Sequence, residues 1–163
     1  MKTAICYYSR HHGNTMQVLE SMAQEQEIDL INVTSRIAAH LEQYDCIGFA
    51  SGIYYSKFHE TVVDYARHYL PQGKKVFLVC THGSGHFSEK YIKDITEAVG
   101  QKGSELVGTF SCRGYDTFGP FGWIGGIAKG HPDEQELQTA KYFIRQITAG
   151  LESTHTVWKR KGE

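Results

Sequence analysis

The residues between positions 9 and 15 combine the side chains and the backbone freedom that a phosphate site needs. They follow an apolar run, lead straight into a helical pattern, and are Ser9, Arg10, His11, His12, Gly13, Asn14 and Thr15. Gly13 permits unusual backbone angles and Asn14 tolerates turns, so the hydroxyls and backbone N–H groups can form an anion-binding nest. The helix N-terminus adds partial positive charge, and a phosphate can then be held without a lysine. The same residues also suit an ordinary capped turn, with Ser9 or Asn14 as the cap.

A second segment of interest is rich in glycine and histidine, and it follows another apolar run. It consists of Thr81, His82, Gly83, Ser84, Gly85 and His86. Its glycines resemble part of a dinucleotide fingerprint, but the third glycine is missing and the segment follows the wrong strand. His82 or His86 could donate a proton in catalysis. The simpler interpretation is that both are solvated loop histidines.

The four cysteines form no metal or redox motif. Cys6, Cys46, Cys80 and Cys112 lie far apart, each in an apolar run, and no C-x-x-C is present. Free cysteine behaves as a small core residue, so we predict buried thiols and no metal site. A redox pair of Cys80 and Cys112 is the weaker interpretation, because cytosolic thiols usually stay reduced.

Short apolar runs alternate with helical patterns, and these elements must position the loops. The runs predict five strands, at residues 3–8, 28–33, 46–50, 75–80 and 105–112. Apolar stripes of helical period predict helices over residues 15–22, 58–69, 91–99 and 137–147, with a shorter helix within 35–44. This alternation predicts an α/β protein with a doubly wound sheet. Ligands of such sheets bind beyond the carboxyl ends of the strands, so the loops after the first, third, fourth and fifth strands are the places to look.

Residues 114–130 follow neither period. Tyr115, Phe118, Phe121 and Trp123 are interspersed with glycines there. A loop of this length is uncommon in a compact domain and is often functional. We expect either a substrate or partner surface near the site, or a closing loop whose aromatic residues cover the core.

Size and charge narrow the classes of protein. The chain of 163 residues fits one domain, expected over residues 1–150 and followed by a polar C-terminal tail over 151–163. The net charge of −1 argues against nucleic-acid binding. No segment approaches the ~20 apolar residues of a membrane span. No signal-peptide pattern leads the chain, so we expect a cytoplasmic protein.

Three segments together carry a resemblance to a known family. The pattern Ser-x-x-x-Gly-Asn-Thr at residues 9–15 resembles the phosphate loop of the flavodoxin family, with a longer opening than its usual form. Residues 44–54 are similar to the third strand and flavin loop of that family, and residues 73–81 to its fourth strand. The resemblance implies a flavodoxin-like three-layer sandwich, in which a five-stranded parallel sheet of order 2-1-3-4-5 has helices on both faces.

The resemblance further implies a cofactor and its contacts. FMN, held non-covalently, would have its phosphate in the loop of residues 9–15 and its ring between the loops after strands three and four. The contacts implied for the ring and its edge are Ser51, Gly52, Ile53, Tyr54, Tyr55, Thr81, His82, Gly83, Ser84, Gly85, Cys112, Arg113 and Gly114. Tyr54 or Tyr55 could stack on the flavin, and the Ser51–Gly52 peptide could bond to the ring edge and tune its potential.

Two redox functions then compete. An electron carrier would exchange electrons with redox partner proteins, whereas an oxidoreductase would act on a small redox substrate of the quinone or protoporphyrinogen type. Flavodoxin carriers are generally strongly acidic, and the near-neutral charge of this chain weakens that interpretation. Electron transfer still ranks first, because no substrate-binding residue can be named. A mononucleotide-binding module without redox chemistry is the non-enzyme alternative. A Cys-x5-Arg phosphatase loop and the paired aspartates of a receiver domain are both missing.

Overall fold

A parallel sheet runs through the middle of the molecule. The computed structural model describes residues 1–10, 13–35, 39–117, 119–150 and 157–158. The strands are β1 (Thr3–Tyr8), β2 (Ile28–Asn32), β3 (Cys46–Tyr54), β4 (Lys57–Phe58), β5 (Lys75–His82), β6 (Glu105–Arg113) and β7 (Val157–Trp158). Their order is β2-β1-β3-β5-β6-β7, with β4 paired to β3 alone. The five main strands therefore have the predicted parallel order, and β7 adds a sixth that the sequence pattern did not predict.

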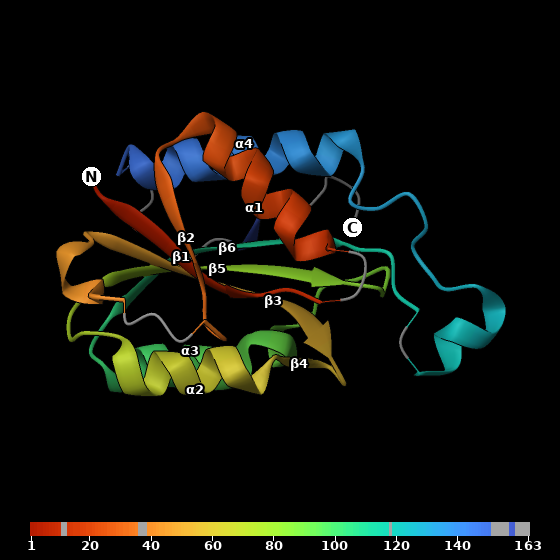
Figure 1. The fold of residues 1–163 in the computed structure, drawn as a ribbon, viewed down its shortest axis with the longest axis horizontal. Coiled ribbons are helices and arrows are strands. Elements are labelled where there is room, and N and C mark those ends of the chain that lie inside the picture. Colours follow the sequence, from red (N-terminus) through yellow and green to blue (C-terminus); the bar gives the residue numbers. More distant parts are fainter. Residues whose placement is uncertain (11–12, 36–38, 118, 151–156, 159–163) are drawn as a thin grey trace.

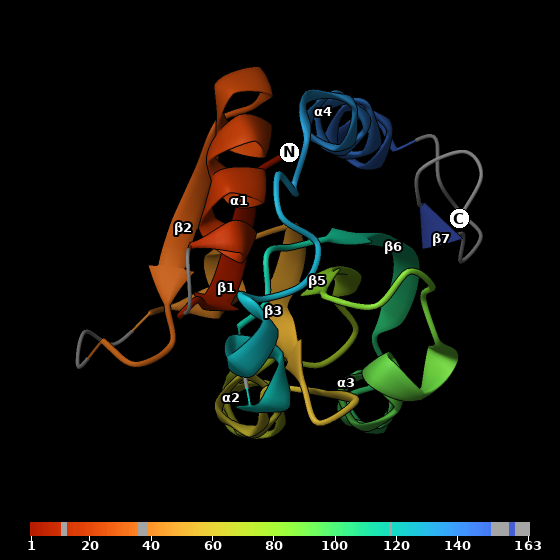
Figure 2. The same ribbon diagram turned by 90° about the vertical axis from the view of Figure 1, so that its right-hand side faces the viewer.

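Helices cover both faces of this sheet. On one face lie α1 (Asn14–Glu25) and α4 (Glu134–Thr148), and on the other α2 (Glu60–Tyr69) and α3 (Lys93–Gln101) (Figure 1, Figure 2). Three short 3₁₀ helices are η1 (Leu41–Gln43), η2 (Glu89–Ile92) and η3 (Gly119–Ile124). The predicted three-layer arrangement is confirmed.

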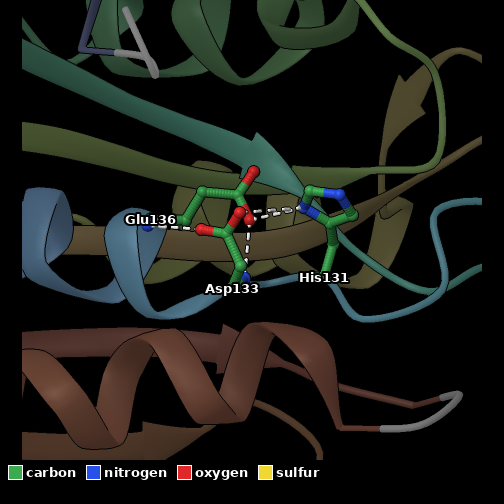
Figure 3. A group of neighbouring side chains, drawn as sticks. All are labelled: His131, Asp133 and Glu136. Carbon is green, nitrogen blue, oxygen red and sulfur yellow. Dashed lines mark hydrogen bonds and ion pairs between the residues drawn. The ribbon is translucent and has the colours of Figure 1, made fainter.

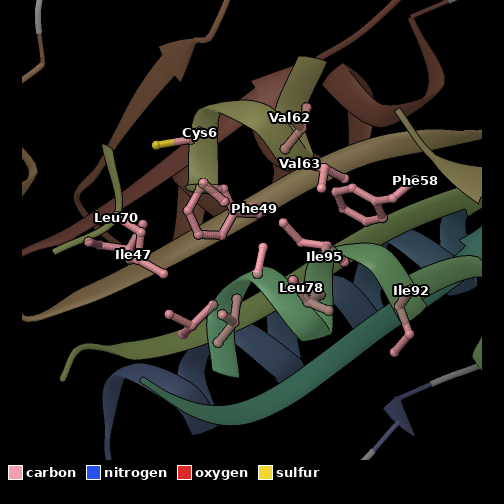
Figure 4. Packing of buried hydrophobic residues seen from close by; sticks show 14 of the residues in the cluster. Cys6, Ile47, Phe49, Phe58, Val62, Val63, Leu70, Leu78, Ile92 and Ile95 are labelled. Carbon is pink, nitrogen blue, oxygen red and sulfur yellow. The ribbon is translucent and has the colours of Figure 1, made fainter. Parts of the chain in front are cut away.

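Two apolar cores hold the three layers together. In the first, residues of β1, β3 and β5 meet α2 and α3, with Phe49 and Phe58 lying close to Val63 and Ile95 (Figure 4). The second core lies under α1 and α4, where Phe143 packs against Phe77 and Phe110. The central strands are almost continuously buried because both of their faces meet helices. The predicted buried thiols are confirmed, since all four cysteines are free and buried.

Two segments differ from the sequence expectations. Of the helix expected within residues 35–44, only η1 forms in the described part, and residues 36–38 lie outside it. Residues 114–130 contain η3 and an antiparallel bridge between Asp116 and Ile127, which closes the segment into a loop. We call the described residues of this segment, 114–117 and 119–130, the cap; Phe118, which the sequence analysis singled out, lies outside them. It projects at the carboxyl edge of the sheet, beyond the end of β6 (Figure 1).

Candidate functional site

The turn between β1 and α1 leaves hydrogen-bonding groups without partners among the described residues. Gly13 stands at the N-cap with a φ of 64°, a left-handed conformation that glycine adopts at little cost, and no side chain of the described residues caps α1. The first N–H groups of a helix need partners from outside it. The Ser9 hydroxyl is buried and has no hydrogen-bond partner among the described residues. His11 and His12, also expected at this site, lie outside the described residues.

Contacts from two other strands hold this turn in place. The Thr15 and Thr81 hydroxyl oxygens are 2.9 Å apart, which joins α1 to the end of β5. The Asn14 side-chain amide donates to the Tyr115 carbonyl over 2.7 Å. A Cβ on Gly114 would come within 2.7 Å of the Asn14 amide, so this close approach of β6 requires glycine. Asn14 therefore ties the turn to the cap and does not act as a helix cap.

A cleft opens above these contacts, at the carboxyl edge of the sheet. We call it the phosphate cleft. Many of the predicted residues line it, namely Arg10, Asn14, Thr15, Gly52, Ile53, Tyr54, Thr81, His82, Gly83 and Gly114. Tyr115 and Asp116 of the cap complete the lining. It lies where β1 has β2 on one side and β3 on the other, which is the switch point at which doubly wound sheets bind ligands.

A larger cavity of about 380 Å³ continues from the phosphate cleft under the cap. We call it the capped cavity. Ile53, His82, Gly83 and Asp116 line both spaces, and the walls of the cavity are Tyr55, Ser56, Ser84, Tyr91, Pro120, Phe121 and Ile127. One wall thus comes from the loop after β3, one from the loop after β5 and one from the cap.

The wall after β3 is a tight hairpin turn. Tyr55 and Ser56 connect β3 to β4 with φ values of 49° and 61°, which are uncommon for residues other than glycine. Ser51 is fully buried below the turn, and its hydroxyl oxygen accepts a hydrogen bond from the His59 N–H over 3.0 Å. The side chain of Tyr55 is 83% exposed at the tip.

His82 is buried and does not have the solvated position that the sequence suggested. Its Nδ1 lies 3.0 Å from the Ser84 carbonyl, so Nδ1 carries the proton and donates. Its Nε2 lies 2.9 Å from the Ser111 hydroxyl, which then donates to it. Burial lowers the pKa of His82, and the charge of Arg113 acts in the same direction. The ring is therefore neutral with both nitrogens satisfied, and it orients the loop after β5 instead of donating a proton. His86 is exposed.

Tyr54 is the last residue of β3 and contacts the turn after β1. Burial raises the pKa of Tyr54 to about 12, and the Arg10 backbone N–H donates to its hydroxyl. The ring lies against Gly52, where an added Cβ would meet it at 3.3 Å. The hydroxyl is consequently neutral and sits beside the groups left open at the phosphate cleft.

Some predicted residues lie away from the cleft. Cys112 is buried in the core under α4, and burial raises the pKa of Cys80 to about 12, so the interpretation of these cysteines as a redox pair gains no support. The Arg113 backbone N–H donates to Glu136 over 3.3 Å. Gly85 lines neither the phosphate cleft nor the capped cavity.

Other residues around the site escaped the sequence analysis. Tyr8, His59, Tyr91 and Asp116 line the cavities. Tyr8 could have been noticed, because it ends an otherwise buried strand at the edge where ligands bind. The other three are brought in by tertiary contacts, which no local pattern indicates.

One side-chain group in the described part of the chain has ligand atoms close enough for a metal ion. His131, Asp133 and Glu136 place these atoms within 4.8 Å of one another (Figure 3). A capping box accounts for them: Asp133 accepts from the Glu136 N–H over 2.9 Å, and Glu136 accepts from the Asp133 N–H over 2.7 Å. Glu136 also lies 2.7 Å from His131 Nδ1. The carboxylates are thus used to start α4, and we assign no metal to them.

The geometry fits a phosphorylated ligand with a flat ring system. The uncapped start of α1 and the orphaned Ser9 hydroxyl offer donors of the kind that hold a phosphate. The capped cavity next to them has apolar and aromatic walls. These features define a doubly wound α/β protein with an open helix N-terminus at its switch point.

Comparisons with known proteins narrow this class. A family model for the flavodoxin domain matches residues 4–115. An uncharacterized protein of Methanocaldococcus jannaschii is 35% identical over 147 residues, which are 90% of this chain and 98% of that protein. The chain belongs to the flavodoxin domain family.

Solved structures agree with the fold. Oxidised flavodoxin 2 from Bacillus cereus aligns with a TM-score of 0.68 and 19% identity, over 92% of this chain and 99% of that one. A flavodoxin from Fusobacterium nucleatum bound to flavin mononucleotide aligns with a TM-score of 0.64 and 15% identity, over the same shares. In the described part of this chain, no helix has the length and apolar character needed to cross a bilayer.

Proposed function

We propose that this protein binds FMN non-covalently in the phosphate cleft and the capped cavity and passes electrons through it. The observation that carries the proposal is the orphaned Ser9 hydroxyl in the turn that leads into an uncapped α1, because buried polar groups in native proteins nearly always have partners. A phosphate would accept hydrogen bonds from both. FMN supplies reversible electron transfer when it is bound.

The residues of the chain would share the work of holding this cofactor. Ser9, Thr15 and the N–H groups at the start of α1 bind the phosphate. Tyr55 and the loop from His82 to Ser84 enclose the ring, with His82 fixing the shape of that loop. Phe121 and Ile127 of the cap cover the cavity and exclude water from it.

A second function, oxidoreduction of a small substrate, is favoured by the cap. The cap closes one side of the cavity with Pro120 and Phe121, and it places Trp123 in solvent with 92% of its surface exposed. A substrate of the quinone or protoporphyrinogen type could meet the ring under such a cover. Redox proteins are the partners expected of a carrier, and a cytoplasmic location suits both functions.

The visible spectrum of the purified protein tests the proposal. A yellow protein that releases FMN on denaturation supports it, and anaerobic titration with candidate donors then separates a carrier from an oxidoreductase. Release of FAD, or no uptake when FMN is supplied, would refute the FMN assignment.

A further inference from the structure

A third cavity adjoins the phosphate cleft, and the proposed function does not use it. Its volume is about 390 Å³. We call it the aromatic pocket, and its principal lining residues are Tyr8, Arg10, Tyr54, Lys57, Phe58 and His59. Arg10 and Tyr54 also line the phosphate cleft, and Tyr55 lines both this pocket and the capped cavity, so the three spaces are neighbours.

Aromatic rings form most of the walls of this pocket. The rings of Tyr8 and His59 are stacked, with centroids 3.9 Å apart and planes at 20°. Tyr54 meets His59 edge to face at 5.1 Å, and Phe58 is almost fully buried. Such surfaces favour another flat ring, which can stack or make edge contacts.

The backbone holds the His59 ring in place. The His59 backbone N–H donates to the Ser51 hydroxyl oxygen, and the ring Nδ1 accepts from the Thr61 N–H over 3.2 Å at the start of α2. Burial lowers the pKa of His59, so the ring is neutral at pH 7. A ring fixed before binding loses little side-chain entropy when a ligand arrives.

The charges at the pocket favour an anion. Arg10 and Lys57 provide two cations against the single carboxylate of Glu60, in a chain whose net charge is −1. Lys57 lies 3.7 Å from Asp94, but both side chains are substantially exposed, and an exposed pair of this kind is weak. The ammonium group therefore remains able to attract a ligand.

We propose that the aromatic pocket is a second ligand site, which binds a planar aromatic carboxylate next to the cofactor. The ring of the ligand lies against the aromatic walls, and its carboxylate lies toward Arg10 and Lys57. This inference goes beyond the proposed function and does not depend on FMN, because the pocket is formed by the chain alone.

The test uses 2-naphthoate as the probe and 2-naphthylmethanol as its neutral counterpart. Each is titrated into the full chain, without flavin and with FMN in excess, while amide NMR shifts are followed. We expect 2-naphthoate to bind under both conditions and to shift residues 8–10 and 54–60. The neutral alcohol should bind more weakly. Displacement of the probe by FMN, equal affinity for the two compounds, or shifts elsewhere would overturn the proposal.

Variants of the chain separate charge from stacking. Lys57→Ala should weaken 2-naphthoate binding about three-fold at low salt, the size expected of one exposed charge. Lys90→Ala, an exposed control in η2, should not. Tyr8→Leu should weaken binding about ten-fold through lost ring contacts, and Tyr142→Leu on α4 serves as its control. If Tyr8→Leu does not fold, the amide shifts of the unmodified chain still show whether 2-naphthoate binds in the aromatic pocket. If the chain takes up no flavin, the titration without FMN still tests the pocket.

Discussion

Ser9 carries the most specific information about a ligand at the scale of single residues. Its hydroxyl is buried without a partner in the described structure, and an unmade hydrogen bond in the interior costs about 1–3 kcal/mol. Thr15, by contrast, already shares a hydrogen bond with Thr81. The unpaired Ser9 hydroxyl destabilises the ligand-free protein, and a bound ligand could accept its hydrogen bond. Ser9 therefore indicates a ligand-bound state.

Ser9→Ala should therefore separate stability from binding. We expect the free energy of unfolding of the flavin-free chain to stay constant or rise by up to about 1 kcal/mol, because an unsatisfied hydroxyl is removed. FMN affinity should fall about ten-fold, whereas riboflavin affinity should change little. Chemical denaturation and flavin fluorescence measure the two quantities. Ser21→Ala is the control, since that buried hydroxyl bonds within α1. Loss of stability together with unchanged FMN affinity would show that Ser9 is structural.

His82 predicts a pH dependence of stability. Burial lowers its pKa in the folded chain below the ordinary value of 6.5, so the unfolded chain binds more protons as the pH falls. The free energy of unfolding should therefore have its highest value above pH 6.5. Below pH 6.5 it should decrease, by at most about 1.4 kcal/mol per pH unit for one histidine. Denaturation of the protein and of His82→Asn between pH 7.5 and 5.5 checks this. An equal slope in both proteins would contradict it.

At the scale of elements, the cap and the hairpin of β3 and β4 shape the site on a rigid sheet. Both lie beyond the carboxyl ends of the strands, and both contribute to the capped cavity. The hairpin turns through two residues with positive φ, and the cap is closed by the bridge between Asp116 and Ile127. The capped cavity thus takes most of its walls from loops, whereas the phosphate cleft is lined largely by the ends of β3, β5 and α1.

Local pattern predicted the main elements well and the loops poorly. The strands β1, β3, β5 and β6 are apolar because helices cover both faces of the sheet. These strands can therefore be predicted from the sequence. The two-residue strands β4 and β7 are too short to have a period. His59 and Asp116 reach the site through hairpin and cap contacts, and such contacts depend on tertiary pairing. The burial of His82 is not predictable from local pattern, because it depends on β5 extending to His82 and on its contact with the Ser111 hydroxyl of β6.

The cap yields a prediction about Trp123. Since 92% of this side chain is exposed, Trp123→Ala should leave the free energy of unfolding within about 0.5 kcal/mol. FMN affinity should also be nearly unchanged, whereas electron delivery to an acceptor should slow if the cap meets the partner or substrate. Phe121→Ala removes part of the cavity wall and should weaken FMN binding. Unfolding of the Trp123 variant would indicate that the cap covers the core.

At the scale of the whole molecule, the fold is that of flavodoxins, whereas the net charge gives little support to a carrier that docks by electrostatic attraction. The fold is shared with flavodoxins along nearly the whole chain. The net charge of −1 offers little long-range attraction to a basic partner protein. Steering of a partner would then depend on the surface around the cap and not on the overall field. We accordingly expect the rate of electron delivery to depend only weakly on ionic strength, and a steep decrease with added salt would contradict this.

Affinity for FMN compared with affinity for riboflavin tests the central claim most directly. The two ligands share the ring and the ribityl chain and differ only in the phosphate. Two charge-assisted hydrogen bonds from the start of α1 and Ser9 correspond to a preference of about 100-fold or more for FMN. Fluorescence titration of the flavin-free chain with each ligand gives the ratio. A preference of that size supports a phosphate cleft at residues 9–15, and equal affinities would contradict it.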